Sequence, residues 1–352
     1  MKKLLKALLT GILAVSMVAG CAKTGAPEND VPSEDGKDLP VLKVAMMPFI
    51  TSLPAQYIIE NKLDEKAGFK IEPIMFASGA PMNEALAAGL WDVGAMGAAA
   101  VTGVANYDMM IIGEVLESQD GLGVFVKADS EIAKIKGFNP SLPDVYGNPD
   151  TVKDITILLP IGTAQHFTTL KWLEKIGVKP EEVNIVNMDT AQAYQALLAG
   201  QCDAVALNVP TFFDAINDGM VQVGNLAKLG TKYVDMVTAN RNSIETKREL
   251  IEKYLELVVE ACEALNADQD MATELMMDFL KASGAESSEE NVRSDLERVK
   301  FMGKEDWEDR ELGNFARELG EFYIGVGQLD ASLMDKFDTN IDATLMEAVL
   351  AK

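Results

Sequence analysis

Few residues of this sequence could perform chemistry. The 352 residues include one histidine, His166, and three cysteines. A four-ligand Cys/His zinc site would need all four of them, and three cysteines are too few for a disulfide scaffold. A serine or cysteine triad needs a histidine base beside its nucleophile, and the chain contains no Gly-x-Ser-x-Gly motif. We therefore expect no metal site, no cofactor and no enzymatic activity.

Composition and charge narrow the class of protein. Hydrophobic residues make up 48% of the chain and charged residues 24%, which is typical of a soluble globular protein. Asp and Glu number 55 against 31 Lys and Arg, so the net charge is −24. A chain this acidic is a poor binder of phosphate backbones, and we expect no nucleic-acid partner. The length fits two domains of ordinary size.

The N-terminus has the features of an export signal. Three lysines precede an apolar run that ends in Val18-Ala19-Gly20-Cys21. A cysteine directly after Ala-Gly resembles the lipobox of bacterial lipoproteins. The resemblance implies a signal peptide over residues 1–20 and lipidation of Cys21, which would become the new N-terminus. A plain signal peptide or a signal anchor is the alternative.

Residues 21–39 are predicted to form a flexible tether. They carry glycines, prolines and scattered acids with few large apolar side chains, so they cannot bury enough surface to fold alone. No later segment is apolar over the roughly 20 residues that a spanning helix needs. We expect an extracytoplasmic protein that is lipid-anchored to the cell membrane.

From residue 41 onward, short β-rich runs alternate with helical patterns. This alternation is typical of βαβ units and of a mostly parallel sheet. The predicted strands are Val41–Met46, Phe69–Phe76, Asp92–Ala95, Met109–Glu114, Leu122–Lys127, Ile155–Leu159, Val183–Asn187, Asp203–Leu207 and Val221–Val223.

One sequence unit occurs twice. Glu84–Asp92 aligns without a gap with Gln195–Asp203, and five of the nine positions are identical. In each copy the glycine is expected to end a helix in the left-handed conformation, and the aspartate is expected to open a buried strand. A common helix ending could produce this match, but the shared order of flanking strands favours two related lobes.

The remainder of the chain is predicted to be helical. After residue 232, apolar residues recur at helical spacing. The predicted helices are Thr246–Leu265, Met271–Lys281, Glu289–Val299 and Arg310–Tyr323. The domain boundaries are then 40–127 for the first lobe, 128–232 for the second, and 233–352 for a return to the first lobe with C-terminal helices. The hinge crossings are expected near Lys127–Ala128 and Lys232–Val234.

Several motifs in this order resemble one family, the solute-binding lipoproteins of ABC importers for nitrate, sulfonates, taurine and thiamine-pyrimidine precursors. The similarity covers about residues 40–285. The motifs are Phe76-Ala77-Ser78-Gly79 before a helix, the run from Ala87 to Gly94, Gly162-Thr163-Ala164-Gln165-His166-Phe167 at the head of a helix, and Asp203-Ala204-Val205-Ala206.

The resemblance implies a fold and a function. The fold is α/β, with two doubly wound lobes of the type II periplasmic-binding-protein class and a ligand cleft between them. A monomer would clamp a small organic solute or an anion such as a sulfonate, taurine or nitrate, and would deliver it to the permease and ATPase of an importer. A sensory binding lipoprotein would have the same fold. An enzyme related to thiamine-pyrimidine synthesis is a weaker alternative.

Ligand contacts are predicted where strands end and helices begin, since ligands bind there in open α/β sheets. In the first lobe they are Phe49, Thr51, Ser78, Gly79, Ala80, Gly97, Ala98 and Glu117. In the second lobe they are Thr163, Gln165, His166, Asp189, Thr190, Asn208, Pro210 and Thr211.

Several of these residues have a structural alternative. Ser78, Thr163 and Thr190 stand at helix starts, where a hydroxyl can serve only as an N-cap. His166 is either a neutral ligand donor or a packed core histidine, and Glu117 is either an acceptor for a ligand amine or a solvated acid. Three aromatic residues could form pocket walls, namely Phe49, Trp91 and Phe167. Core packing is favoured for Trp91. The acidic stretch Glu286–Glu297 is interpreted as a solvated helix face.

Overall fold

The computed structural model describes residues 39–118 and 120–352. The predicted signal peptide, the predicted lipidation site Cys21 and residues 21–38 of the predicted tether lie outside the described residues. Within the described ranges, no helix has both the length and the apolar character needed to cross a membrane.

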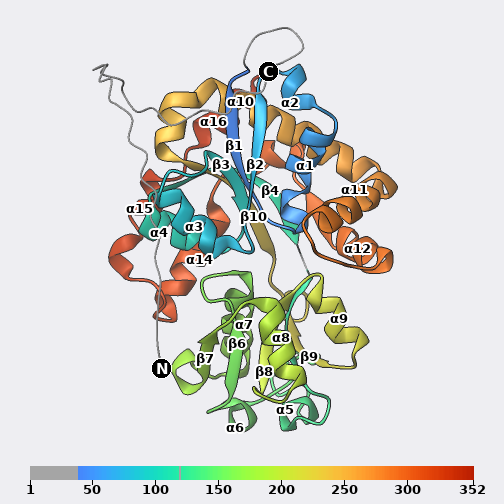
Figure 1. Ribbon diagram of the computed structural model, residues 1–352. Coiled ribbons are helices and arrows are strands. Elements are labelled where there is room, and N and C mark those ends of the chain that lie inside the picture. The colour runs from blue at the N-terminus through green and yellow to red at the C-terminus, as the bar shows by residue number, and fades with distance from the viewer. Residues whose placement is uncertain (1–38, 119) are drawn as a thin grey trace, which may run out of the picture. The chain divides into compact units, whose positions relative to one another are not determined.

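Two separate β-sheets organise these residues (Figure 1). The strands are β1 (Val41–Met46), β2 (Lys70–Met75), β3 (Val93–Met96), β4 (Met109–Ser118), β5 (Leu122–Val126), β6 (Thr156–Leu159), β7 (Asn184–Asn187), β8 (Ala204–Asn208), β9 (Val221–Asn225), β10 (Tyr233–Asn240) and β11 (Val299–Phe301). The first sheet has the order β11-β4-β10-β3-β1-β2 and the second β7-β6-β8-β5-β9. We call the first sheet, together with the helices packed on it, lobe one. The second sheet with its helices is lobe two.

All nine predicted strands are present, but two strands were missed. β10 was missed because Asp235 interrupts its apolar run, and β11 because it is only three residues long. The helix predicted over Glu289–Val299 ends at Leu296, and Val299 is instead the first residue of β11. The tail after residue 232 therefore contributes strands to lobe one as well as helices.

The prediction of mostly parallel sheets was wrong. β1 pairs in parallel with β2 and β3, and β6 pairs in parallel with β7 and β8. The other five strand pairings are antiparallel, and all of them involve β4, β5 or β10. These strands flank the connections between the two sheets. A strand that arrives from the other sheet is not bound by the parallel geometry that a crossover helix imposes.

The first crossing between the lobes lies earlier than predicted. β5 pairs with β8 and β9, so it belongs to lobe two, and the chain crosses between Ser118 and Leu122 rather than near Lys127–Ala128. The second crossing enters β10 at Tyr233, whose register partner on β4 is Ser118. The two crossings therefore lie side by side. The sequence pattern misplaced the first crossing because the apolar run of β5 does not indicate which sheet it joins.

Helices cover both sheets. Those of lobe two are α5 (Glu131–Lys134), α6 (Pro149–Val152), α7 (Ala164–Ile176), α8 (Thr190–Leu198) and α9 (Thr211–Asn217). Those of lobe one are α1 (Leu53–Glu60), α2 (Leu63–Lys66), α3 (Gly79–Ala87), α4 (Ala99–Tyr107), α10 (Arg241–Ala267), α11 (Gln269–Ala282), α12 (Glu289–Leu296), α13 (Lys304–Glu308), α14 (Asn314–Gly325), α15 (Lys336–Thr339) and α16 (Ala343–Leu350). Short 3-10 turns lie at Ile50–Ser52, Pro180–Glu182 and Ala331–Leu333.

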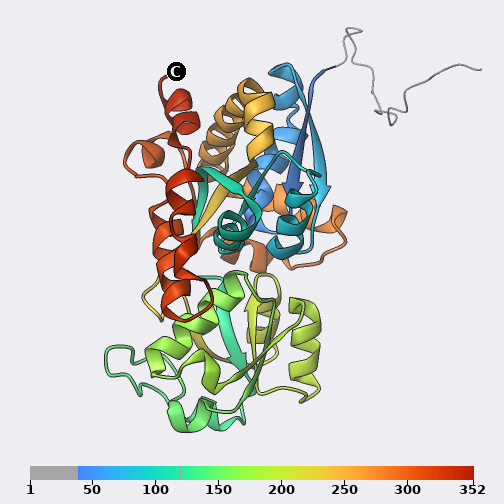
Figure 2. The same ribbon diagram turned by 90° about the vertical axis from the view of Figure 1, so that its left-hand side faces the viewer.

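The C-terminal helices pack on lobe one. α10 contacts α1, β4 and α16, and the red C-terminal helices run along one side of the sheet in Figure 2. One large hydrophobic core unites these elements. Lobe two has two smaller cores on opposite faces of its sheet, because successive residues of β5 alternate between them.

The internal repeat corresponds to the same local structure in both lobes. In lobe one, the Asp92 carboxylate accepts the backbone N–H of Lys43 at 2.8 Å, and the Asp92 N–H is donated back to the Lys43 carbonyl at 2.9 Å. In lobe two, Asp203 makes the same pair of bonds with Thr156, at 2.8 and 3.1 Å. Each aspartate ties the start of its strand to a parallel neighbour, which is β1 in lobe one and β6 in lobe two.

The glycine of each repeat ends its helix as predicted. Gly89 and Gly200 have φ values of 67° and 71°, in the left-handed region that favours glycine. The next residue in each copy donates its N–H to the alanine carbonyl five positions earlier, at Ala85 and Ala196. These bonds close the same C-terminal turn in both lobes.

We predict unequal stability losses at the two repeat aspartates. Asp92 is buried and also accepts bonds from Ser243 Oγ at 2.6 Å and Lys247 Nζ at 2.8 Å, whereas Asp203 is exposed. Asp92→Ala should lower the free energy of unfolding by about 3 kcal/mol, because it leaves buried donors unpaired. Asp203→Ala should cost clearly less. Urea denaturation of both variants measures the difference, and equal losses would contradict the prediction.

Candidate functional site

A cavity of about 130 Å³ lies where the two lobes and both crossings meet. Its lobe-one wall comes from the loop after β1, the start of α3 and the loop after β3. Its lobe-two wall comes from the starts of α7 and α8 and the loop after β8. The remaining lining residues come from the crossings and from α11, α12 and the segment between them.

Eleven of the sixteen predicted contact residues line this cavity. They are Phe49, Thr51, Ser78, Gly79, Gly97, Ala98, Thr163, Gln165, Thr190, Asn208 and Pro210. They come from segments as far apart as β1 and α9, and the strand-to-helix pattern brings them together. Their contact with a ligand stays a prediction.

The hydroxyls at the helix starts are not N-caps. Ser78 and Thr163 occupy the N-cap positions of α3 and α7 in extended conformation, yet neither side chain accepts a capping hydrogen bond. Thr190 is the first residue of α8 and does not cap it. The hydroxyl of Thr163 instead donates to the Pro160 carbonyl at 2.6 Å. The N-cap alternative therefore does not account for these three residues.

Gln165 organises the lobe-two wall. Its side-chain amide donates to Thr190 Oγ1 at 3.0 Å and to Asn208 Oδ1 at 2.9 Å. Its Oε1 lies 3.0 Å from Thr163 Oγ1. Gln165 is only 6% exposed, so one buried amide fixes polar groups from three separate segments. This wall is polar and uncharged.

His166 lies next to Gln165 in sequence but does not line the cavity. Its ring is buried, its Nδ1 accepts the backbone N–H of Gly162 at 3.2 Å, and its ring stacks 6.2 Å from that of Tyr323 on α14. Burial lowers the pKa of His166 to about 4, so the ring is neutral at physiological pH. Successive helical residues point about 100° apart, which is why Gln165 faces the cavity and His166 faces α14.

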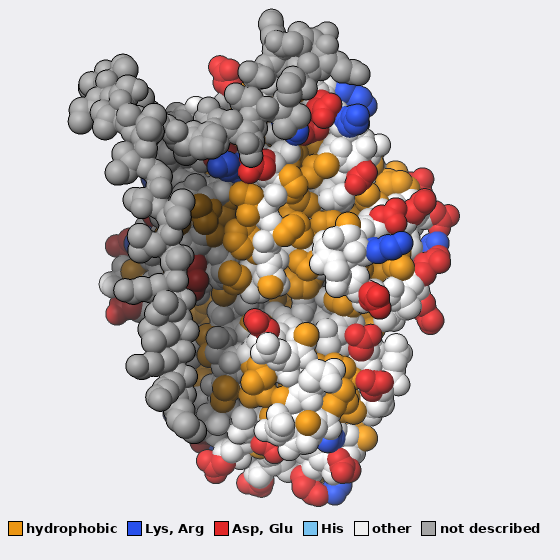
Figure 3. All heavy atoms as spheres, viewed as in Figure 1, with side chains coloured by type: hydrophobic (Ala, Val, Ile, Leu, Met, Phe, Trp, Pro, Cys, Tyr) orange, Lys and Arg blue, Asp and Glu red, His pale blue; other side chains and the backbone are white. Residues whose placement is uncertain are grey.

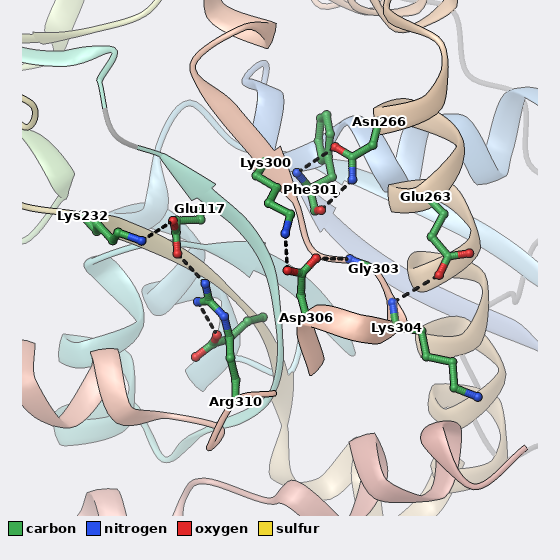
Figure 4. A network of polar contacts seen from close by, with 11 residues as sticks. Glu117, Lys232, Glu263, Asn266, Lys300, Phe301, Gly303, Lys304, Asp306 and Arg310 are labelled. Atoms are coloured by element: carbon green, nitrogen blue, oxygen red, sulfur yellow. Dashed lines mark hydrogen bonds and ion pairs between the residues drawn. The ribbon is translucent and has the colours of Figure 1, made fainter. Parts of the chain in front are cut away.

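Glu117 belongs to a partly buried ion-pair cluster instead of the lining. Its carboxylate pairs with Lys232 at 2.9 Å and with Arg310, whose guanidinium also lies 3.5 Å from Glu114 (Figure 4). Burial acts to raise the pKa of Glu117, but the hydrogen bonds from Arg310 and Lys232 outweigh it and lower the pKa. Glu117 is 8% exposed, so the solvated-acid alternative is also wrong.

The other predicted contacts outside the lining sit one residue away from it. Ala80, Asp189 and Thr211 follow or precede lining residues on α3, α8 and α9. Of the possible walls, Phe49 lines the cavity, while Trp91 is core and donates its indole N–H to the Met82 carbonyl at 2.9 Å. Phe167 packs against Tyr233, Phe315 and Phe322.

Sequence reasoning missed the contribution of the crossings and of α11 and α12. The main residues missed are Asp120, Tyr233, Asp235, Met276, Leu280, Ser287, Val292 and Asp295. A charged residue inside the apolar run Tyr233–Val237 was a usable signal for Asp235. No comparable signal marked Asp295, which is 7% exposed although it belongs to the stretch interpreted as solvated.

Two of these acids are perturbed by burial. Burial raises the pKa of Asp235 to about 7, with a smaller opposing effect of the nearby Thr51 hydroxyl. Burial likewise raises the pKa of Asp295 to about 7, with Arg298 lowering it and Asp120 and Asp235 raising it. Asp235 keeps partial exposure toward the cavity.

We predict that Asp235 and Asp295 make the free energy of unfolding depend on pH. Each carboxyl has an ordinary pKa of 3.8 and a folded pKa of about 7, so the folded chain holds its protons more tightly between these values. The pair's contribution to the free energy of unfolding therefore falls as pH rises from about 4 to about 7. Asp235→Asn should become more stable relative to the unmodified protein across this window and level off above it.

Chemical denaturation at pH 5, 6, 7 and 8 measures this difference. The groups facing the pair, Arg298, Asp120 and Tyr233, remain in both proteins. The exposed Glu290 on α12 supplies the control, since Glu290→Gln should show no such trend. A pH-independent difference for Asp235→Asn would contradict the prediction.

In residues 39–118 and 120–352, no group of three or more His, Cys, Asp or Glu side chains is arranged to hold a metal ion.

Sequence comparison identifies the family. The family model described as the NMT1-like family matches residues 35–277. The chain belongs to the NMT1-like family. A provisionally named ABC transporter periplasmic binding protein of Brachyspira hyodysenteriae is 38% identical over 99% of this chain and 100% of its own length. The taurine-binding periplasmic protein of Escherichia coli is 22% identical over 60% of this chain and 62% of its own.

Solved structures share the fold of this NMT1-like chain. The alkanesulfonate-binding protein of Xanthomonas axonopodis, bound to MOPS, has a TM-score of 0.67 at 17% identity and covers 86% of this chain and 98% of its own. The nitrate-binding protein of Synechocystis has a TM-score of 0.69 at 14% identity and covers 89% of each chain. These matches confirm the periplasmic-binding-protein fold that the sequence motifs implied.

Proposed function

We propose that this chain is the extracytoplasmic solute-binding protein of an ABC importer. It would clamp a small solute between lobe one and lobe two and deliver it to a membrane permease and its ATPase. The observation that carries the proposal is the cavity at the meeting point of the two lobes, lined by strand ends and helix starts from both. The name of the Brachyspira relative supports the same role.

The proposed motion is a hinge closure about the two crossings. Ser118 and Tyr233 are register partners, so the crossings form one narrow hinge between the sheets. Tyr233 also anchors the lobe-one wall, since its hydroxyl accepts the backbone N–H of Ala98. A change in the angle at this hinge would open or close the cavity without disturbing either sheet.

The proposed contacts are the eleven predicted residues that line the cavity. The starts of α3 and α7 add backbone N–H groups, and each helix start adds about 0.3–1 kcal/mol to the binding of a negatively charged group. The relatives named for taurine, alkanesulfonate and nitrate make such solutes reasonable first candidates. The protein would act as a monomer, held outside the membrane by lipid on Cys21.

The sequence alternative of an enzyme finds no support at the cavity. The single histidine is neutral, stacks on Tyr323 and does not line the cavity, so it cannot act there as the base of a triad.

The test begins with native mass spectrometry of the purified full-length protein to identify a retained solute. Gln165→Ala should then weaken binding of that solute about tenfold, because it removes the amide that fixes Thr190 and Asn208. Gln195→Ala is the matched control, since Gln195 is exposed on α8 and does not line the cavity. Calorimetry measures both, and an unchanged affinity in Gln165→Ala would count against the proposed site.

A further inference from the structure

The charge of the cavity is one-sided. Among the described residues that line it, three are acids, namely Asp120, Asp235 and Asp295, and none is Lys, Arg or His. All three come from lobe one or the first crossing, whereas the lobe-two wall is neutral. Acidic side chains also gather on the surface over α11 and α12, at the right-hand edge of Figure 3. Arg298 lies outside the lining, 3.9 Å from Asp120, and its single charge offsets only one of the three acids, so the field at this end of the cavity favours a positive charge.

Two of the three acids lack a well-formed hydrogen bond from the described part of the chain. Asp120 accepts the N–H of Gly121 at 2.8 Å and the amide of Asn225 at 2.7 Å. Asp235 and Asp295 accept no hydrogen bond of normal geometry at their side chains from the residues that the structure describes, although the Thr51 hydroxyl lies near Asp235 and Asp295 is 93% buried. Buried carboxylates are normally paired or hydrogen-bonded, so a group that donates hydrogen bonds is missing at this pair.

Two neutral groups at the same wall are also unpaired. Thr51 is 5% exposed and lines the cavity beside Asp235, and its Oγ1 has no partner of normal hydrogen-bond geometry within residues 39–118 and 120–352. The hydroxyl of Ser287, on the segment that leads into α12, is buried and unpaired in the same lining. The Thr51 hydroxyl lies close enough to the Asp235 carboxyl to lower its pKa. Unsatisfied buried polar atoms that share one cavity point to a polar ligand there.

The surroundings of the acids set the size and shape of that ligand. Met276, Leu280 and Val292 from α11 and α12 form an apolar surface beside them. The cavity, at about 130 Å³, is close to the roughly 150 Å³ engineered cavity that admits benzene. A ligand of this size could reach from the acids to the polar wall around Gln165.

We propose that the cavity binds a small organic amine in its protonated form, whose ammonium N–H groups donate to Asp235 and Asp295. This inference rests on the proposed solute-binding function and specifies its ligand class. The ligand would carry a short apolar body against α11 and α12. At its other end, a neutral or anionic group could meet the lobe-two wall. An anion without an amine, such as nitrate or a simple alkanesulfonate, would leave both carboxyls unpaired.

The test compares amines with matched compounds that lack the amine, using the full-length protein. The amine probes are n-butylamine, cyclohexylamine and 2-aminoethanesulfonate, and the amine-free probes are butane-1-sulfonate, sodium nitrate and calcium chloride. Thermal unfolding and calorimetry at pH 8 should show binding by at least one amine and at least tenfold weaker binding by every amine-free probe. At pH 6 the amine should bind with release of protons, measurable in buffers of different ionisation enthalpy.

Variants locate the effect. Asp235→Asn and Asp295→Asn should each weaken amine binding at least tenfold, while Asp278→Asn, an exposed acid on α11, should leave it unchanged. Circular dichroism confirms that each variant is folded. Retained amine binding in the folded double variant would overturn the assignment of the pair.

The outcomes separate this inference from the proposed function. Binding of butane-1-sulfonate or nitrate as tight as that of the amines would overturn the amine assignment and leave the solute-binding function standing. Equally tight binding of calcium would replace the amine with a metal ion. If no probe binds and the purified protein retains no solute, both proposals fail.

Discussion

The pairing of β4 with β10 is the constraint on which the rest of the structure depends. Both crossings leave this pair at its end, where Tyr233 faces Ser118 across the ladder. The same two strands carry two acidic residues with different roles. Asp235 lines the cavity, and Glu117 holds Lys232 and Arg310 in the ion-pair cluster. The proposed hinge and one wall of the site are thus parts of one antiparallel ribbon, and a change in its register would displace both.

The C-terminal helix α14 adds a second connection between the lobes. Phe315 and Phe322 on this helix pack edge-on against Phe167 of α7, with ring centres 6.3 and 5.7 Å apart. Lys171 of α7 lies 3.6 Å from the ring centre of Phe322. Figure 2 shows the red helix beside both lobes. The family match ends at residue 277, so it includes the α7 side of this contact but not α14.

The strands and most of the site could be predicted because their signals are local. Apolar runs marked nine strands, and small or hydroxyl residues between a strand and a helix marked Ser78, Thr163 and Thr190 as neighbours of the cavity. Sheet membership could not be read in this way, since β5 has the same apolar pattern in either sheet. Asp295 was hidden for a related reason, because the surface that buries it comes from distant segments.

The repeat makes the two lobes alike in construction, yet their contributions to the cavity differ in charge. Lobe one carries Asp235 and Asp295, while lobe two offers amides and hydroxyls held by Gln165. An arriving guest with a charged end would therefore meet its strongest attraction on one half alone, even when the halves stand apart. Binding to lobe one and closure of the cleft would then be separate steps, and lobe two would mainly close over a solute that lobe one has already bound.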